Sequence, residues 1–85
     1  MNRSKIIEAV KKITSNNGIQ KAFLFGSFAR GEKYHDIDIA IEPPEGFTLL
    51  DLSRVANQIK DKIGVEVDLI TTRSIHPLLK NSIQR

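Results

Sequence analysis

The most constraining feature of this chain is the segment at residues 36–42, where isoleucines alternate strictly with other side chains. A period of two indicates a β-strand with one face in the core. Asp36 and Asp38 would share the opposite face, with their Cα atoms about 7 Å apart. An ordinary sheet gains nothing from this pair, because neighbouring like charges repel each other. The strand therefore predicts a core on one side of a sheet and a chemical site on the other. The side chains expected to face the core are Ile37, Ile39 and Ile41.

Apolar periodicity elsewhere predicts a small α/β (α+β) domain. Helices are expected where apolar residues recur at three- and four-residue spacing, over residues 2–15, 48–63 and 74–84. A short apolar run bounded by glycine predicts a buried strand at 21–25, and alternation predicts another at 65–70. Residues 26–31 between the first two strands are expected to form a tight turn containing one short helical turn. We therefore expect a mixed sheet of three to four strands whose isoleucine face is covered by helices.

The sequence also predicts where the helices begin and end and which aromatic side chains lie in the core. Thr48 and Asp51 have the spacing of a capping box, and Gly64 suits the left-handed residue that ends a helix. Asn2 or Ser4 can cap the first helix. The phenylalanines in and after the first strand are expected in the core rather than in a base-stacking platform. These are Phe23, Phe25 and Phe28.

Composition narrows the class of protein. The 85 residues suit one domain, over residues 1–85. The absence of cysteine excludes disulfides and thiolate metal sites, and two histidines argue against zinc. No apolar run reaches the roughly 18 residues of a membrane span, and the N-terminus is unlike a signal peptide, so a cytoplasmic protein is expected. The net charge is +3, but the basic residues are scattered, which argues against a nucleic-acid partner.

A third carboxylate completes the acidic set. Asp68 lies in the apolar run of the last expected strand. If that strand lies beside residues 36–42, then Asp36, Asp38 and Asp68 converge. Carboxylate oxygens are ligands that Mg²⁺ prefers. Three of them suffice to hold two magnesium ions roughly 4 Å apart, an arrangement that clamps the attacking and leaving oxygens in phosphoryl-type transfer.

Gly26 and Ser27 supply features suited to a phosphate. They follow the first strand and open the short helical turn, where backbone N–H groups are exposed. Those groups and the serine hydroxyl can bind a phosphate, and glycine lets the backbone approach a ligand closely. Arg30 follows within reach of phosphate charge.

Each piece alone has a simpler interpretation. Gly-Ser after a strand usually forms only a turn, and two alternating aspartates often mark the solvent face of a strand. Asp68 alone could cap a turn or pair with a lysine, and Glu66 on the same face suits the exposed start of its strand. Tyr34 and His35 suit an exposed loop better than a base-binding site. The conjunction of all the motifs, in this order, is far more specific than any one of them.

The stretch GSFARGEKYHDIDIAI, with VDLI further on, resembles the nucleotidyltransferase superfamily that includes the DNA polymerase beta palm. Within it, the minimal (MNT) branch matches best, over roughly residues 21–71. The resemblance implies a polymerase beta-like palm core in which Gly26 and Ser27 bind nucleotide phosphates. It also implies that Asp36 and Asp38 are metal ligands, and that Asp68 is a third carboxylate that helps to activate the attacking hydroxyl.

The resemblance also implies a biological role. Minimal nucleotidyltransferases commonly pair with a small helical HEPN protein as toxin–antitoxin systems. The antitoxin transfers AMP from ATP to a tyrosine of the HEPN toxin. Two alternatives stay open: a binding module that neutralises its partner by contact, and a transferase acting on a small molecule or a nucleic-acid end. Apolar helix faces in so small a domain suit either a homodimer or a complex with a partner.

Overall fold

A computed structural model describes residues 2–72 of the chain. Its element order agrees with the expected order, and each boundary lies within a residue or two of its expected position. The helix expected at 74–84 lies outside the described residues. The elements are α1 (Arg3–Asn16), β1 (Lys21–Phe25), α2 (Gly26–Ala29), β2 (Asp36–Glu42), α3 (Leu49–Ile63) and β3 (Glu66–Thr71).

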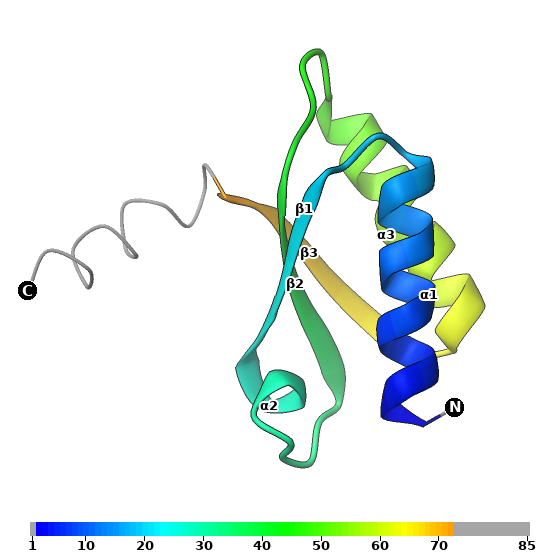
Figure 1. The fold of residues 1–85 in the computed structure, drawn as a ribbon, viewed down its shortest axis with the longest axis vertical. Helices are drawn as coiled ribbons and strands as arrows, with labels where there is room; N and C mark the ends of the chain where they lie inside the picture. The colour runs from blue at the N-terminus through cyan, green and yellow to red at the C-terminus, as the bar shows by residue number, and fades with distance from the viewer. Residues whose placement is uncertain (1, 73–85) are drawn as a thin grey trace, which may run out of the picture.

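The three strands form one mixed sheet in the order β1-β2-β3. β1 runs antiparallel to β2, to which it is joined through α2, and β3 runs parallel to β2 after the α3 crossover. The two long helices, α1 and α3, lie together on one side of the sheet (Figure 1). α2 lies at the end of the sheet where β1 ends and β2 begins. The expected mixed sheet with a helix-covered face is confirmed.

The core lies between the two long helices and the alternating face of β2. All three isoleucines of that face are fully buried. Val55 and Ile59 from α3 and Ile6 from α1 meet them there. Apolar burial is the main stabilising contribution to such a fold, so the isoleucine face fixes which side of β2 turns inward. The second face of β2, with its aspartates, consequently faces away from the helices.

β1 corrects one sequence-based expectation, because it is not a buried strand. Phe23 is 51% exposed, and the first three residues of the strand are open to solvent. β1 is an edge strand, and neither long helix covers the face that Phe23 shares with the aspartates. Leu24, on the opposite face, packs against the core. Phe28 is fully buried as expected, so the expectation of a core position is right for Phe28 and wrong for Phe23.

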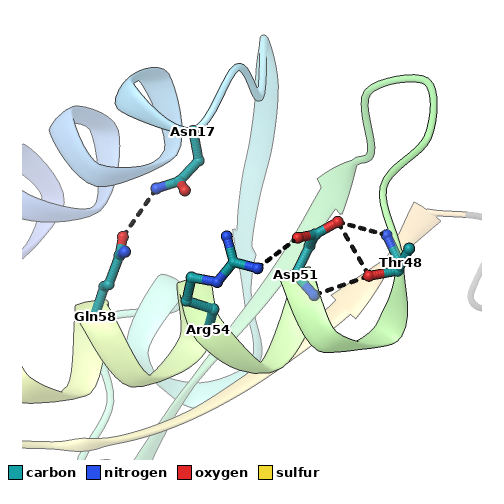
Figure 2. Close-up of polar contacts among 5 residues, drawn as sticks. All are labelled: Asn17, Thr48, Asp51, Arg54 and Gln58. Atoms are coloured by element: carbon teal, nitrogen blue, oxygen red, sulfur yellow. Dashed lines mark hydrogen bonds and ion pairs between the residues drawn. The ribbon is translucent and has the colours of Figure 1, made fainter.

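The ends of the helices use the expected caps. The Asn2 side chain accepts a hydrogen bond from the backbone of Lys5, so Asn2 rather than Ser4 caps α1. Thr48 and Asp51 form a reciprocal capping box, and Arg54 adds an ion pair to Asp51 (Figure 2). These contacts lower the pKa of the Asp51 carboxyl, chiefly through the hydrogen bond from the Thr48 backbone.

One side-chain hydrogen bond connects the end of α1 to α3. Asn17, just after α1, donates a side-chain hydrogen bond to Gln58 of α3 (Figure 2). Gly64 ends α3 in the left-handed conformation, with a φ of 73°, and the chain enters β3 two residues later.

Among residues 2–72, no helix is both long enough and apolar enough to cross a membrane.

Candidate active site

Strand register brings the predicted carboxylates onto one face. Asp38 of β2 is the direct register partner of Asp68 on β3. Asp36 lies two residues before Asp38 and therefore points to the same side of the sheet. The sequence left open whether the two strands are neighbours, and the parallel pairing of β2 with β3 answers that they are. This is the face that the long helices leave uncovered.

Gly26 sits directly against this carboxylate face. Phe25, the last residue of β1, is the register partner of Asp38, so α2 begins beside that aspartate. A Cβ atom built on Gly26 would lie 2.2 Å from Oδ2 of Asp38, far inside van der Waals contact. Gly26 also has a φ of +75°, which favours glycine. The backbone conformation thus favours glycine here, and any larger residue would have to displace the Asp38 carboxylate or move α2.

The surroundings of Asp38 disfavour the charged form of its carboxyl group. Its pKa is raised above the ordinary 3.8, first because the carboxyl is partly buried and then because Asp36 and Asp68 repel its charge. The Arg30 side chain opposes this and lowers the pKa. The ionised carboxylate therefore destabilises the metal-free fold, since the folded state binds the proton more tightly than the unfolded chain does.

Asp38→Asn is expected to raise the melting temperature of the metal-free protein at neutral pH. A raised folded-state pKa contributes stability below the ordinary pKa, and this is lost as pH rises through the folded value. The advantage of the Asn variant should therefore grow from pH 4 to pH 7 and then level off. Thermal unfolding in buffers containing a chelator measures it. A difference that stays constant across this range would show that folding does not raise the pKa of Asp38.

The other predicted site residues occupy different settings. Ser27 is half-buried in α2, and its carbonyl accepts a hydrogen bond from the backbone of Glu32 at 2.9 Å. Arg30 is exposed and pairs with Glu32, with Nη2 and Oε1 3.1 Å apart. Glu66 is the register partner of Asp36, but its carboxylate forms an ion pair with Lys60. The interpretation of Glu66 as a residue at the exposed start of its strand is confirmed.

The donor set can be compared with what a magnesium ion requires. Asp36, Asp38 and Asp68 offer hard carboxylate oxygens from adjacent register positions, and their mutual repulsion is relieved by a bound cation. As the side chains lie, residues 2–72 contain no group of three or more acidic or histidine side chains gathered closely enough to hold a metal ion. The oxygen ligands of these three aspartates suit the ion, although the side chains as they lie do not converge on one point.

A surface hollow lies away from these residues. It has a volume of about 620 Å³ and lies at the start of β1 and the end of α1, lined by Lys11, Thr14 and Ile19 among others. α2 and the carboxylates lie at the opposite end of β1. The hollow contains none of the predicted site residues, so the strand register of the aspartates and the approach of Gly26 to Asp38, rather than the size of a cavity, locate the candidate site.

Arg3 contacts α2, the element that carries Gly26 and Ser27, in a way that sequence reasoning missed. Its side chain donates a hydrogen bond to the Phe28 carbonyl and lies over the Phe28 ring. From the sequence, Arg3 is only one of the scattered basic residues. No local pattern signals the contact, because Arg3 and Phe28 are 25 residues apart in the chain.

Comparison with known proteins agrees with the fold and the motifs. A family model described as "Nucleotidyltransferase domain" matches residues 3–85. Two curated relatives from Methanocaldococcus jannaschii, both named "Putative protein adenylyltransferase", are 44% and 40% identical to this chain. The first alignment covers 98% of this chain and 91% of the relative. The second covers 94% and 86%.

Two solved structures share the arrangement of elements. One, described as "Structure of putative minimal nucleotidyltransferase", has a TM-score of 0.81 and 32% identity, and the match covers 100% of this chain and 92% of that one. The other, described as "Crystal structure of the toxin-antitoxin with AMP-PNP", has a TM-score of 0.68 and 29% identity, with 87% and 60% covered. The fold is therefore that of a minimal nucleotidyltransferase.

Proposed function

The chain belongs to the nucleotidyltransferase domain family, and we propose that it transfers AMP from ATP to a tyrosine hydroxyl of a HEPN-type toxin, thereby acting as the antitoxin. The observation that carries the proposal is the direct pairing of Asp38 with Asp68, with Gly26 pressed against Asp38. Gly26 and Ser27, which we propose to bind the phosphates, therefore begin α2 beside the face that carries the three aspartates. The relatives named as adenylyltransferases support AMP as the group transferred.

In this proposal the chain's own residues hold and orient the reactants. Gly26 and Ser27 bind the nucleotide phosphates, and Asp36, Asp38 and Asp68 would hold two magnesium ions. When bound, the ions would neutralise phosphate charge and polarise the phosphate oxygens. Asp68 orients the acceptor hydroxyl and accepts its proton at a carboxylate oxygen. The acceptor oxygen bonds to the α-phosphorus, the bond from that phosphorus to the bridging oxygen breaks, and pyrophosphate leaves.

The expected partner is supported by a structural neighbour and by the exposed surface. The neighbour is described as a toxin–antitoxin with AMP-PNP, an ATP analogue. On this chain, Leu49 and Leu50 at the start of α3 are 83% and 78% exposed. Exposed neighbouring leucines are typical of a surface that contacts another protein. A complex with the toxin, with or without a homodimer of this chain, agrees with that exposure.

The test is transfer of label from ATP to the candidate toxin. We expect the chain, incubated with magnesium, ATP labelled at the α-phosphate and the toxin, to leave label on the toxin at a tyrosine. Asp38→Asn should leave none. A folded wild-type chain that binds the toxin and labels nothing would contradict the proposal.

The exposed leucines also favour a second candidate, neutralisation by contact alone. Here Asp38→Asn discriminates between the two, because it removes a carboxylate of the site and leaves Leu49 and Leu50 in place. If the variant still protects cells from the toxin as well as the wild-type chain does, contact rather than transfer is the function. If protection is lost while the variant still binds the toxin, transfer is required.

A further inference from the structure

Arg3 joins the beginning of α1 to α2 through two contacts with one residue. Its Nη1 atom donates a hydrogen bond to the carbonyl oxygen of Phe28. The central carbon of the same guanidinium lies 4.3 Å from the centroid of the Phe28 ring, in the geometry of a cation–π contact. A planar guanidinium can donate and stack at the same time. The side chain is therefore fixed against both the backbone and the ring of α2.

Tyr34 contacts the same ring from another direction. The Tyr34 and Phe28 rings are 4.9 Å apart between centroids and meet edge to face at 87°. Phe28 is completely buried, whereas Arg3 keeps contact with solvent. Since Tyr34 lies two residues before Asp36, the Phe28 ring connects the start of α1, α2 and the loop that leads into the acidic strand.

α2 depends on such contacts for its orientation. It has four residues, too few to be stable as an isolated helix. Hydrogen bonds from Arg30 to Gly26 and from Glu32 to Ser27 close its backbone, but these bonds lie within the turn itself. They set its shape and not its angle to the sheet. Phe28 is the residue through which α2 enters the core.

We propose that Arg3 is a positioning residue for the nucleotide: by holding Phe28 it fixes the orientation of α2, and so the place of Gly26 and Ser27 beside Asp38. The inference rests on the proposed function, because it assumes that Gly26 and Ser27 bind the phosphates. Arg3 itself touches neither the carboxylates nor the phosphate-binding residues in any of these contacts. Its effect must therefore pass through the packing of Phe28.

Two variants of Arg3 separate positioning from simple charge attraction. Arg3→Ala removes both contacts. Arg3→Lys keeps the positive charge but cannot donate to the Phe28 carbonyl and stack on its ring with one planar group. We expect both variants to raise the KM for ATP roughly tenfold, by analogy with the loss of a charged hydrogen bond. The kcat at saturating ATP should change less than about threefold. Arg54→Ala removes an exposed arginine paired with Asp51 on α3 and serves as the control.

A spectroscopic readout follows the packing without any turnover. Tyr34 is the only tyrosine of the chain, which has no tryptophan, so near-ultraviolet circular dichroism in the tyrosine band reports on its contact with Phe28. Arg3→Ala should weaken this band, while the far-ultraviolet spectrum stays that of the wild-type chain. Arg54→Ala should leave both unchanged.

The possible outcomes separate this inference from the proposed function. If the wild-type chain binds a non-hydrolysable ATP analogue and Arg3→Ala binds it equally well, the positioning role is overturned and the proposed function stands. If Arg3→Lys binds the analogue as the wild-type chain does, charge alone is sufficient and the positioning role is again overturned. If the wild-type chain binds no nucleotide, both fall. Weaker binding by both variants, with a weaker tyrosine band, supports the inference.

Discussion

Gly26→Ala is expected to lower the rate of nucleotide transfer by about 100-fold or more, because a displacement of the order of 1 Å in a catalytic site can cost that much. The new Cβ atom would lie 2.2 Å from Oδ2 of Asp38. Either the carboxylate turns away or α2 moves off the sheet. Both movements separate the turn that we propose to bind phosphate from the carboxylates. Affinity for a non-hydrolysable ATP analogue should fall together with the rate.

A matched control separates this clash from backbone strain. Gly46 has a φ of 81°, close to the 75° of Gly26, but a Cβ atom there would meet nothing within 4 Å. Gly46→Ala therefore carries the same left-handed penalty without the contact. We expect it to lower stability and leave transfer nearly unchanged when both variants are assayed well below their melting temperatures. Equal losses of transfer in the two variants would contradict the role given to the approach of Gly26 to Asp38.

Asp68→Asn is expected to lower kcat by at least about 100-fold, the contribution typical of a positioned general base. Asn keeps the size of the side chain and cannot take a proton from the acceptor hydroxyl. The nucleotide affinity should change much less, because Gly26, Ser27 and the two carboxylates of β2 remain. Steady-state rates at varied ATP concentrations measure kcat and KM separately.

The control for Asp68 lies on the same strand and the same face. Glu66→Gln neutralises a carboxylate that is already paired with Lys60. This variant should retain nearly the full rate. If Glu66→Gln lowers kcat as much as Asp68→Asn does, the loss reflects the charge of the face, and Asp68 has no special part in activating the acceptor.

The alternation at residues 36–42 predicted much of this fold. A strand that carries isoleucines on one face and aspartates on the other must bury the isoleucine face in the core and leave the aspartate face outside it. The capping box at Thr48 and the stop at Gly64 likewise follow from local hydrogen-bonding chemistry. The likeness to minimal nucleotidyltransferases confirms the family and fold that the Gly-Ser and aspartate motifs predicted.

Features that depend on long-range pairing could not be read from the sequence. Residues 22–25 are apolar, but an apolar run does not reveal whether a strand lies at the edge of a sheet, and Phe23 proved to be half exposed. The pairing of Asp38 with Asp68 depends on β3 returning parallel to β2 after α3. The contact of Arg3 with Phe28 arises only once α1 has packed beside the sheet.

Paramagnetic broadening by Mn²⁺ tests the central claim most directly, because manganese binds the same oxygen ligands as magnesium and marks its position in an NMR spectrum. With a non-hydrolysable ATP analogue present, small additions of Mn²⁺ should first broaden the backbone amide signals of Gly26, Asp38 and Asp68. The broadening should vanish in a variant with Asn at positions 36, 38 and 68. Broadening that begins at the acidic residues of α3, or that survives in the triple variant, would contradict a metal-dependent nucleotide site on this face of the sheet.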